Sequence, residues 1–158
     1  MIIEPTKNTK LIASLMMHSD LFERITDDTS SAMTKEDIIA HLDDKLDRTI
    51  FLTAMDNDRI VRGFFECEEQ EDSSFDTHPN MLKIGRGPFA FQAAMEVIMM
   101  LFTYTNAKIL RCRVPSKYLD VLRFASSLGF KLDYMVEKEY VKHGEEYDMY
   151  YMIMHKRT

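Results

Sequence analysis

The residues best suited to chemistry lie between Lys83 and Ala90, in the segment KIGRGPFA. Two glycines flank Arg86, and Pro88 suits the first position of a helix because its missing N–H would have no partner there. Glycines let backbone N–H groups approach an anion closely, and the free amides of a helix start add a partial positive charge. With Lys83 and Arg86 as neighbouring cations, the segment predicts a binding site for a phosphate or pyrophosphate. A loop that simply turns a strand into a buried helix explains the same residues equally well.

Acid–base candidates precede this segment. Glu66 ends one expected strand, and Asp76 and His78 lie on the next, where alternation puts both on one face. His78 would titrate near neutral pH if exposed, which suits a base. A surface histidine in a turn with Pro79 is nevertheless the more frequent situation, and a residue such as Glu66 more often faces solvent. The tyrosines near the C-terminus indicate packing or an interface more than a catalytic set.

Hydrophobic periodicity predicts the elements that must position these residues. The expected strands are 1–4, 49–55, 60–66, 75–82, 107–114, 134–141 and 147–154, and the expected helices lie near 9–25 with a break at 18–20, 35–46, 88–102 and 117–128. Segment 68–74 is polar and is expected to form a long hairpin tip. Pro79 confines its strand to an edge, a bulge or an opening.

Several residues mark where helices begin and end. Asn8 or Thr9 can cap the first helix, and Thr34 with Asp37 has the spacing of a capping box. Gly129 lies where a left-handed residue ends the helix before it.

Composition limits the classes of function. A chain of 158 residues with 46% hydrophobic and 29% charged residues predicts one soluble globular domain, residues 1–158. Its net charge of −6 argues against nucleic acid as a main partner. Cys67 and Cys112 have no metal-binding spacing and are expected to be reduced core thiols. Without a signal peptide or a membrane-spanning run, we expect a cytoplasmic protein.

The C-terminal third carries motifs of a known family. AKILRCRVPSKYLDVLRFASSLGF resembles the strand-then-helix segment of the GNAT superfamily of acetyl-CoA-dependent N-acyltransferases, including the signature Leu128-Gly129-Phe130. EYVKHGEEYDMYYMIM is similar to the closing hairpin of that family, with Asp148 entering the last strand. The resemblance covers nearly the whole chain. The short form, with an abbreviated fourth strand around FDTHPNML, is most similar to GNAT-like proteins of tailed bacteriophages, which would place the protein in a host cytoplasm.

The resemblance implies an α/β fold with a mixed, mainly antiparallel sheet, flanked by helices and splayed between the fourth and fifth strands. Acetyl-CoA would lie in that splay, with its pyrophosphate on the amides from Gly85 to Ala90. The implied cofactor-binding residues are Lys83, Ile84, Gly85, Arg86, Gly87, Pro88, Phe89, Ala90 and Val114. The implied reaction is direct attack of an amine on the thioester, with His78, Asp76, Glu66 and Tyr118 as the catalytic candidates.

The sequence also departs from the family pattern. Leu82 stands where the phosphate loop usually has glutamine or arginine. In the helix before the leucine-glycine-phenylalanine signature, Tyr118 and Ala125 stand at the places of the usual asparagine and tyrosine. The tyrosine that often protonates the departing thiolate is therefore missing, and Tyr118 is not obviously placed to replace it.

Two classes of function stay open. In the first, the protein acetylates a small-molecule or protein amine, which the glycine loop favours. In the second, it binds another protein without catalysis, as a virion component or a host-directed inhibitor, which the acidic charge and the missing tyrosine favour. A homodimer is compatible with both. No motif specifies the acceptor.

Overall fold

Seven strands form one sheet in residues 1–157, the part of the chain that the structure, a computed structural model, describes. The strands are β1 (Ile2–Thr6), β2 (Thr49–Met55), β3 (Val61–Glu69), β4 (Ser74–Met81), β5 (Ile109–Pro115), β6 (Lys131–Lys142) and β7 (Glu145–His155). Their order is β1-β2-β3-β4-β5-β7-β6, and neighbours are antiparallel except for the parallel pair β4 and β5. The mixed, mainly antiparallel sheet is therefore confirmed.

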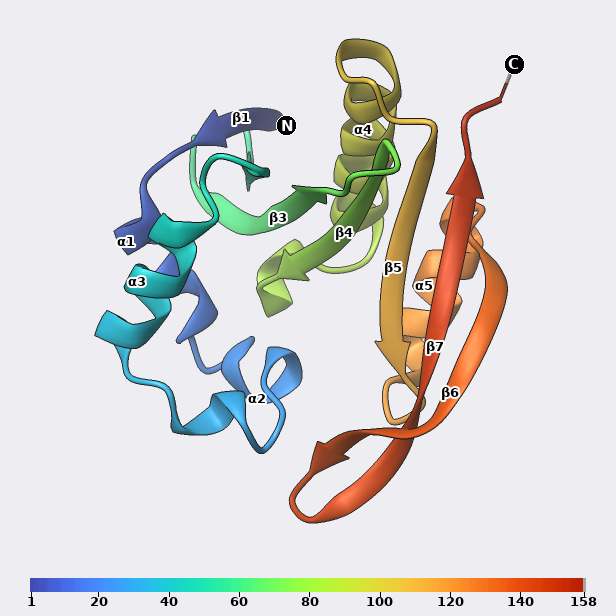
Figure 1. Cartoon of the computed structure of the whole chain (residues 1–158). Helices are drawn as coiled ribbons and strands as arrows, with labels where there is room; N and C mark the ends of the chain where they lie inside the picture. Colours follow the sequence, from blue (N-terminus) through green and yellow to red (C-terminus); the bar gives the residue numbers. More distant parts are fainter. Residues whose placement is uncertain (158) are drawn as a thin grey trace.

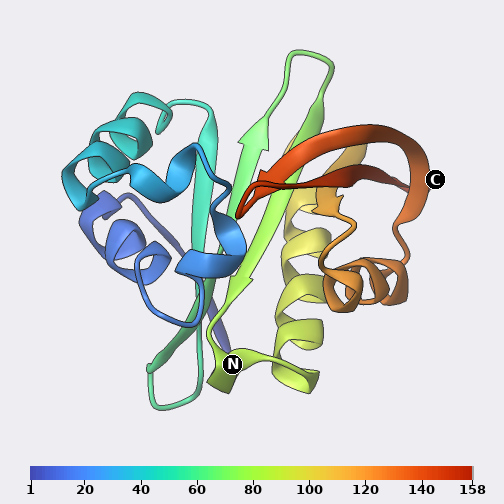
Figure 2. The same cartoon turned by 90° about the horizontal axis from the view of Figure 1, so that it is seen from below.

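Helices lie on both faces of this sheet (Figures 1 and 2). They are α1 (Thr9–Met16), α2 (Phe22–Ile25), α3 (Lys35–Asp44), α4 (Pro88–Tyr104) and α5 (Leu119–Leu128), with short 3₁₀ turns η1 (Ser30–Ala32) and η2 (Lys83–Gly85). Figure 2 shows α1, α2 and α3 on one side of the sheet and α4 and α5 on the other. In Figure 1, α5 lies behind β5, β7 and β6, and no helix of the described chain lies in front of these strands.

The predicted start and stop signals act as expected. The Asn8 side chain accepts a hydrogen bond from the Leu11 N–H, at 3.0 Å, and caps α1. Thr34 and Asp37 form both bonds of a capping box before α3. Gly129 ends α5 with φ 103°, a left-handed conformation that costs glycine little.

The apolar core has one part on each face. Val97 of α4 and Ala125 of α5 pack against the sheet beside Phe65 and Leu110, whereas the other face carries a smaller cluster that includes Leu42 and Phe64. Because β4 lies between these two parts, its side chains face both helical layers.

β4 and β5 pair at their beginnings and then separate. Their last pair in the described chain is Asp76 with Arg111, and just beyond it the Thr77 hydroxyl donates to the Arg111 carbonyl at 3.0 Å. Pro79 lies in the half of β4 that has no partner on this side, as expected for a residue without an N–H. The predicted splay between the fourth and fifth strands is confirmed.

Some predicted boundaries are wrong. The tip expected at 68–74 is shorter, because β3 continues to Glu69 and β4 begins at Ser74. β6 and β7 are longer than their apolar runs and leave a turn at His143 and Gly144. Backbone pairing continues through polar residues at exposed positions, and side-chain pattern alone does not reveal it.

Within residues 1–157, no helix has the length and apolar character needed to cross a membrane. The same residues contain no group of three or more His, Cys, Asp or Glu side chains arranged to hold a metal ion.

Candidate active site

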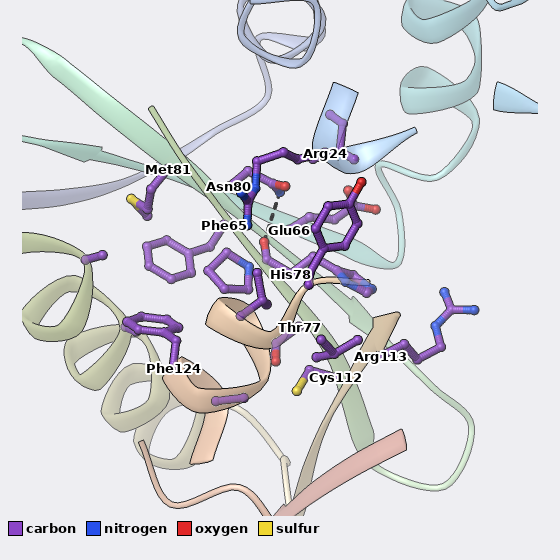
Figure 3. A pocket seen from close by; sticks show the side chains of 18 of the residues that line it. Arg24, Phe65, Glu66, Thr77, His78, Asn80, Met81, Cys112, Arg113 and Phe124 are labelled. Carbon is purple, nitrogen blue, oxygen red and sulfur yellow. Dashed lines mark hydrogen bonds between the residues drawn. The ribbon is translucent and has the colours of Figure 1, made fainter. Parts of the chain in front are cut away.

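A cavity of about 650 Å³ opens where β4 and β5 separate (Figure 3). Its walls come from both strands, from α4 and α5 on one side, and from α2, α3 and β3 on the other. Figure 3 shows Thr77 and His78 of β4, Cys112 and Arg113 of β5 and Phe124 of α5 around it. The cavity therefore connects the two helical layers through the gap in the sheet.

One end of the cavity lies at the first turn of α4. Gly87 precedes the helix at φ 75° and ψ −136°, and Pro88 takes the first helical position. The N–H groups of Gly87, Phe89 and Ala90 have no hydrogen-bond acceptor among the described residues. A Cβ at Gly87 would meet none of the described atoms within 4 Å, so there is space beside these donors. Free amides at the start of a 17-residue helix favour an anion.

Both cations predicted for this site are held by Asp20. The Arg86 guanidinium donates to the carbonyls of Asp20, at 2.9 Å, and Met81, at 3.3 Å. The Lys83 N–H donates to the Asp20 carboxylate at 2.8 Å, and its Nζ lies 3.6 Å from the same group. The Lys83 N–H, followed by nearby positive charges, lowers the pKa of Asp20. Arg86 lines the cavity and Lys83 does not.

Gly85 and Ile84 have structural positions that differ from those expected. The Gly85 N–H donates to the Leu82 carbonyl at 2.8 Å, and a Cβ at Gly85 would overlap the Arg62 carbonyl oxygen. Glycine is therefore needed for the close packing of η2 against β3. The Ile84 side chain is 68% exposed and lies outside the cavity lining.

The wall formed by β5 is apolar where it faces α4 and α5. Val114, a residue that the family resemblance assigns to cofactor binding, lines it together with Cys112. Burial raises the pKa of the Cys112 thiol to about 12. This thiol stays protonated near neutral pH and is a poor nucleophile.

His78 and Glu66 lie beside each other at the side of the cavity nearer α3. They are partners in the β3–β4 register, and Lys45, at the end of α3, forms an ion pair with Glu66. The side chains of Lys45 and Glu66 are 10% and 14% exposed. Burial lowers the pKa of His78 below 6.5; the charge of Glu66 opposes this shift and that of Arg113 adds to it. His78 is therefore mainly neutral near neutral pH and can accept a proton.

Asp76 shares a face of β4 with His78 but lies outside the cavity lining. Gln70 Nε2 donates to Asp76 Oδ2 at 3.3 Å. The Asp76 charge also favours the charged form of the His78 ring, less than that of Glu66 does.

Tyr118 lines the cavity at the start of α5. Its hydroxyl donates to the Glu23 carbonyl at 3.3 Å, and its ring lies 5.0 Å from the Arg24 guanidinium and 6.3 Å from the Tyr140 ring. These contacts place Tyr118 beside α2. Ala125 also lines the cavity and presents a methyl group there.

Five charged residues of the cavity were missed from the sequence: the cations Arg24, Lys45 and Arg113 and the carboxylates Asp27 and Asp120. Arg24 and Lys45 belong to polar helical segments, where nothing distinguishes them from solvated side chains. Arg113 had a signal, because alternation with Cys112 and Val114 puts it on the face opposite the core.

No protein-family model and no curated protein sequence matches the chain. Solved structures of N-acetyltransferases do match its fold. A mutant of spermidine N-acetyltransferase SpeG from Vibrio cholerae matches with a TM-score of 0.82, over 98% of this chain and 95% of that chain, at 13% identity. Ribosomal-protein-alanine N-acetyltransferase from Brucella melitensis matches with a TM-score of 0.79, over 99% of this chain and 100% of that chain, at 16% identity. Because both matches span nearly the whole of each chain, the fold of this protein is that of the GNAT N-acetyltransferases.

Proposed function

We propose that the protein is an N-acyltransferase that moves an acetyl group from acetyl-CoA to a primary amine by direct attack. The separation of β4 and β5 is the observation that supports this most. It opens a cavity with a helix start suited to an anion at one end and the neutral His78 at another side. The GNAT fold agrees with this reaction.

The start of α4 fits the pyrophosphate of acetyl-CoA. The N–H groups of Gly87, Phe89 and Ala90 would hold it, and Arg86 adds a positive charge beside them. The apolar wall at Val114 would contact the pantetheine arm. Acetyl-CoA supplies the acetyl group, activated as a thioester.

His78 would take the proton of the attacking amine. The Glu66 carboxylate, fixed by Lys45, then stabilises the imidazolium that forms, because opposite charges close together favour the charged form. Holding the amine beside this base supplies much of the rate through proximity. Tyr118 lines the same cavity and would be the hydroxyl available to the departing thiolate, a role that Ala125 cannot take.

The test is thiol release from acetyl-CoA with a panel of amines, from small polyamines to peptide N-termini and lysines. We expect release above the buffer rate with at least one amine, and His78→Gln should lower turnover while the affinity for coenzyme A is kept. If no amine reacts although acetyl-CoA binds, the catalytic roles are wrong and a non-catalytic acyl-CoA binder remains.

A second candidate is a GNAT-fold protein that acts by binding another protein. Ala125 favours it, because a cavity residue at the place of the family tyrosine offers no proton. If the resemblance to bacteriophage proteins holds, the partner is a virion or host protein. This resemblance stays a prediction. This candidate requires that neither acetyl-CoA binding nor acetyl transfer is detected.

A further inference from the structure

The charges around the cavity indicate what kind of amine it accepts. Its described lining contains these arginine, lysine, aspartate and glutamate side chains: Arg24, Asp27, Lys45, Glu66, Arg86, Arg113 and Asp120. With histidines counted as neutral, four cations and three carboxylates give the lining one net positive charge, whereas the whole chain carries −6.

Four of these side chains form ion pairs with one another. Arg24 lies 2.6 Å from Asp120, and Lys45 is paired with Glu66. Lys45 is also 3.8 Å from a second carboxylate, that of Glu68. Each of these carboxylates already faces a cation, so it attracts a cationic acceptor less than an unpaired carboxylate would.

Two more side chains are engaged by neutral groups. The Asp27 carboxylate accepts hydrogen bonds from the N–H and the hydroxyl of Ser30, at 2.7 and 2.8 Å. The Arg86 guanidinium donates to two backbone carbonyls at the α4 end of the cavity, where the anion-binding amides lie.

Arg113 differs from all of these. Among the described residues it has no ion-pair or hydrogen-bond partner, and it is exposed on β5. It is close enough to His78 for its charge to act on that ring. Figure 3 shows Arg113 at the rim on the β5 side, whereas Glu66 and His78 come from β3 and β4.

From this arrangement, and resting on the acyltransferase function proposed above, we infer that the acceptor carries a carboxylate near its reacting amine and that Arg113 binds this carboxylate. A guanidinium can give a carboxylate two parallel hydrogen bonds, which orients the acceptor as well as holding it. The amine would then point toward His78. Polyamines lack the anionic group and add positive charge next to Arg113, so they are poor acceptors.

The experiment measures acetyl transfer by the full chain to matched acceptors: leucine, leucinamide, 3-methylbutylamine and spermidine. Each rate is measured with wild type, Arg113→Gln and Arg113→Lys. The ratio of wild-type to variant rates cancels the intrinsic basicity of each amine. We expect Arg113→Gln to lower kcat/KM for leucine about ten-fold, mainly through KM. The same substitution should leave kcat/KM for leucinamide and 3-methylbutylamine unchanged. Arg113→Lys should restore part of the loss.

Arg123→Gln is the matched control. It removes the same charge from an exposed arginine of α5 outside the cavity lining, and it should change none of the rates. An equal loss for all acceptors in Arg113→Gln, or a wild-type preference for spermidine, would overturn the inference while acetyl transfer itself stands.

If no acceptor is turned over, calorimetric titration of the same compounds tests whether Arg113 binds the carboxylate. Tighter binding of leucine than of 3-methylbutylamine to wild type, lost in Arg113→Gln, supports the carboxylate site. Equal binding, or none, contradicts it. A failure of coenzyme A to bind instead contradicts the acyltransferase function on which the inference rests.

Discussion

The protonation state of His78 decides whether the cavity holds a usable base. Burial favours the neutral ring, whereas the paired Glu66 on the neighbouring strand favours the charged ring. The result is a pKa below 6.5. Such a group is available as a base near neutral pH and still gains from Glu66 once it takes a proton.

We therefore predict an acid limb in the pH profile of acetyl transfer. The rate should be level above 6.5 and fall as the pH drops through the lowered pKa of His78, because protonation removes the base. Folding stability changes in the same direction. The stabilisation that comes from the neutral His78 ring is complete above the pKa of this group in the unfolded state, and it is lost as the pH falls through its lower pKa in the folded state. Activity is measured against pH for wild type and His78→Gln.

His155→Gln is the control, because this histidine is exposed at the end of β7. The pH profile of His155→Gln should keep the acid limb. The residual activity of His78→Gln should show no acid limb. An unchanged limb in His78→Gln would assign the titration to another group.

At this scale some of the candidates selected from the sequence line the cavity, and their roles stay predictions. Strand alternation and a polar residue on each strand were enough to select His78 and Glu66. Lys45 could not be found, because its ion pair joins the end of α3 to β3 across the fold. Gly85 was assigned to the anion, but close packing against Arg62 explains it, and only the tertiary contact distinguishes the two.

At the scale of elements, the β6–β7 hairpin fastens α2 and the segment after it. The Lys142 side chain is 1% exposed, and its Nζ donates to the Thr26 carbonyl at 2.7 Å and lies 3.5 Å from the Glu23 carboxylate. The Tyr140 hydroxyl donates to the same carbonyl at 2.9 Å. The Asp28 carboxylate accepts backbone N–H bonds from the hairpin turn. The segment that carries Arg24 and Asp27 is thereby fixed beside the cavity.

Lys142→Met should therefore destabilise the fold by about 2 kcal/mol, because it removes charge-assisted hydrogen bonds to a buried carbonyl. The measurement is the free energy of unfolding from denaturant titration. Lys138→Met is the matched control on the same strand: the side chain of Lys138 is 70% exposed and pairs with Glu146 on the surface, so its loss should cost about 0.5 kcal/mol or less. Equal effects of the two substitutions would contradict the fastening role of Lys142.

Local signals predicted helix ends better than strand ends. Asn8, Thr34 and Gly129 act through bonds or angles within a few residues, so the sequence contains the whole cause. The ends of β3 and β6 depend on a partner strand, and that partner is not visible in the pattern of either strand alone.

At the scale of the whole molecule, the fold could be predicted because the C-terminal motifs resemble one family and the order of elements agrees with it. The acceptor could not, because Arg24, Lys45 and Arg113 come from separate elements that meet only around the cavity. Arg24 and Lys45 are paired with carboxylates and Arg113 is not paired among the described residues, so an acceptor meets the charge of Arg113 and not the net charge of −6.

The central claim is that the gap between β4 and β5 receives an acyl-CoA with its pyrophosphate on the start of α4. Calorimetric titration of coenzyme A into wild type, Gly87→Ala and Gly87→Asp tests it most directly. Both substitutions place a Cβ at a positive φ, so they share the backbone strain, and their difference isolates the added carboxylate. We predict that wild type binds coenzyme A and that Gly87→Asp binds it about ten-fold more weakly than Gly87→Ala, because the carboxylate repels the pyrophosphate. Failure of wild type to bind, or equal affinities of the two variants, would contradict the claim.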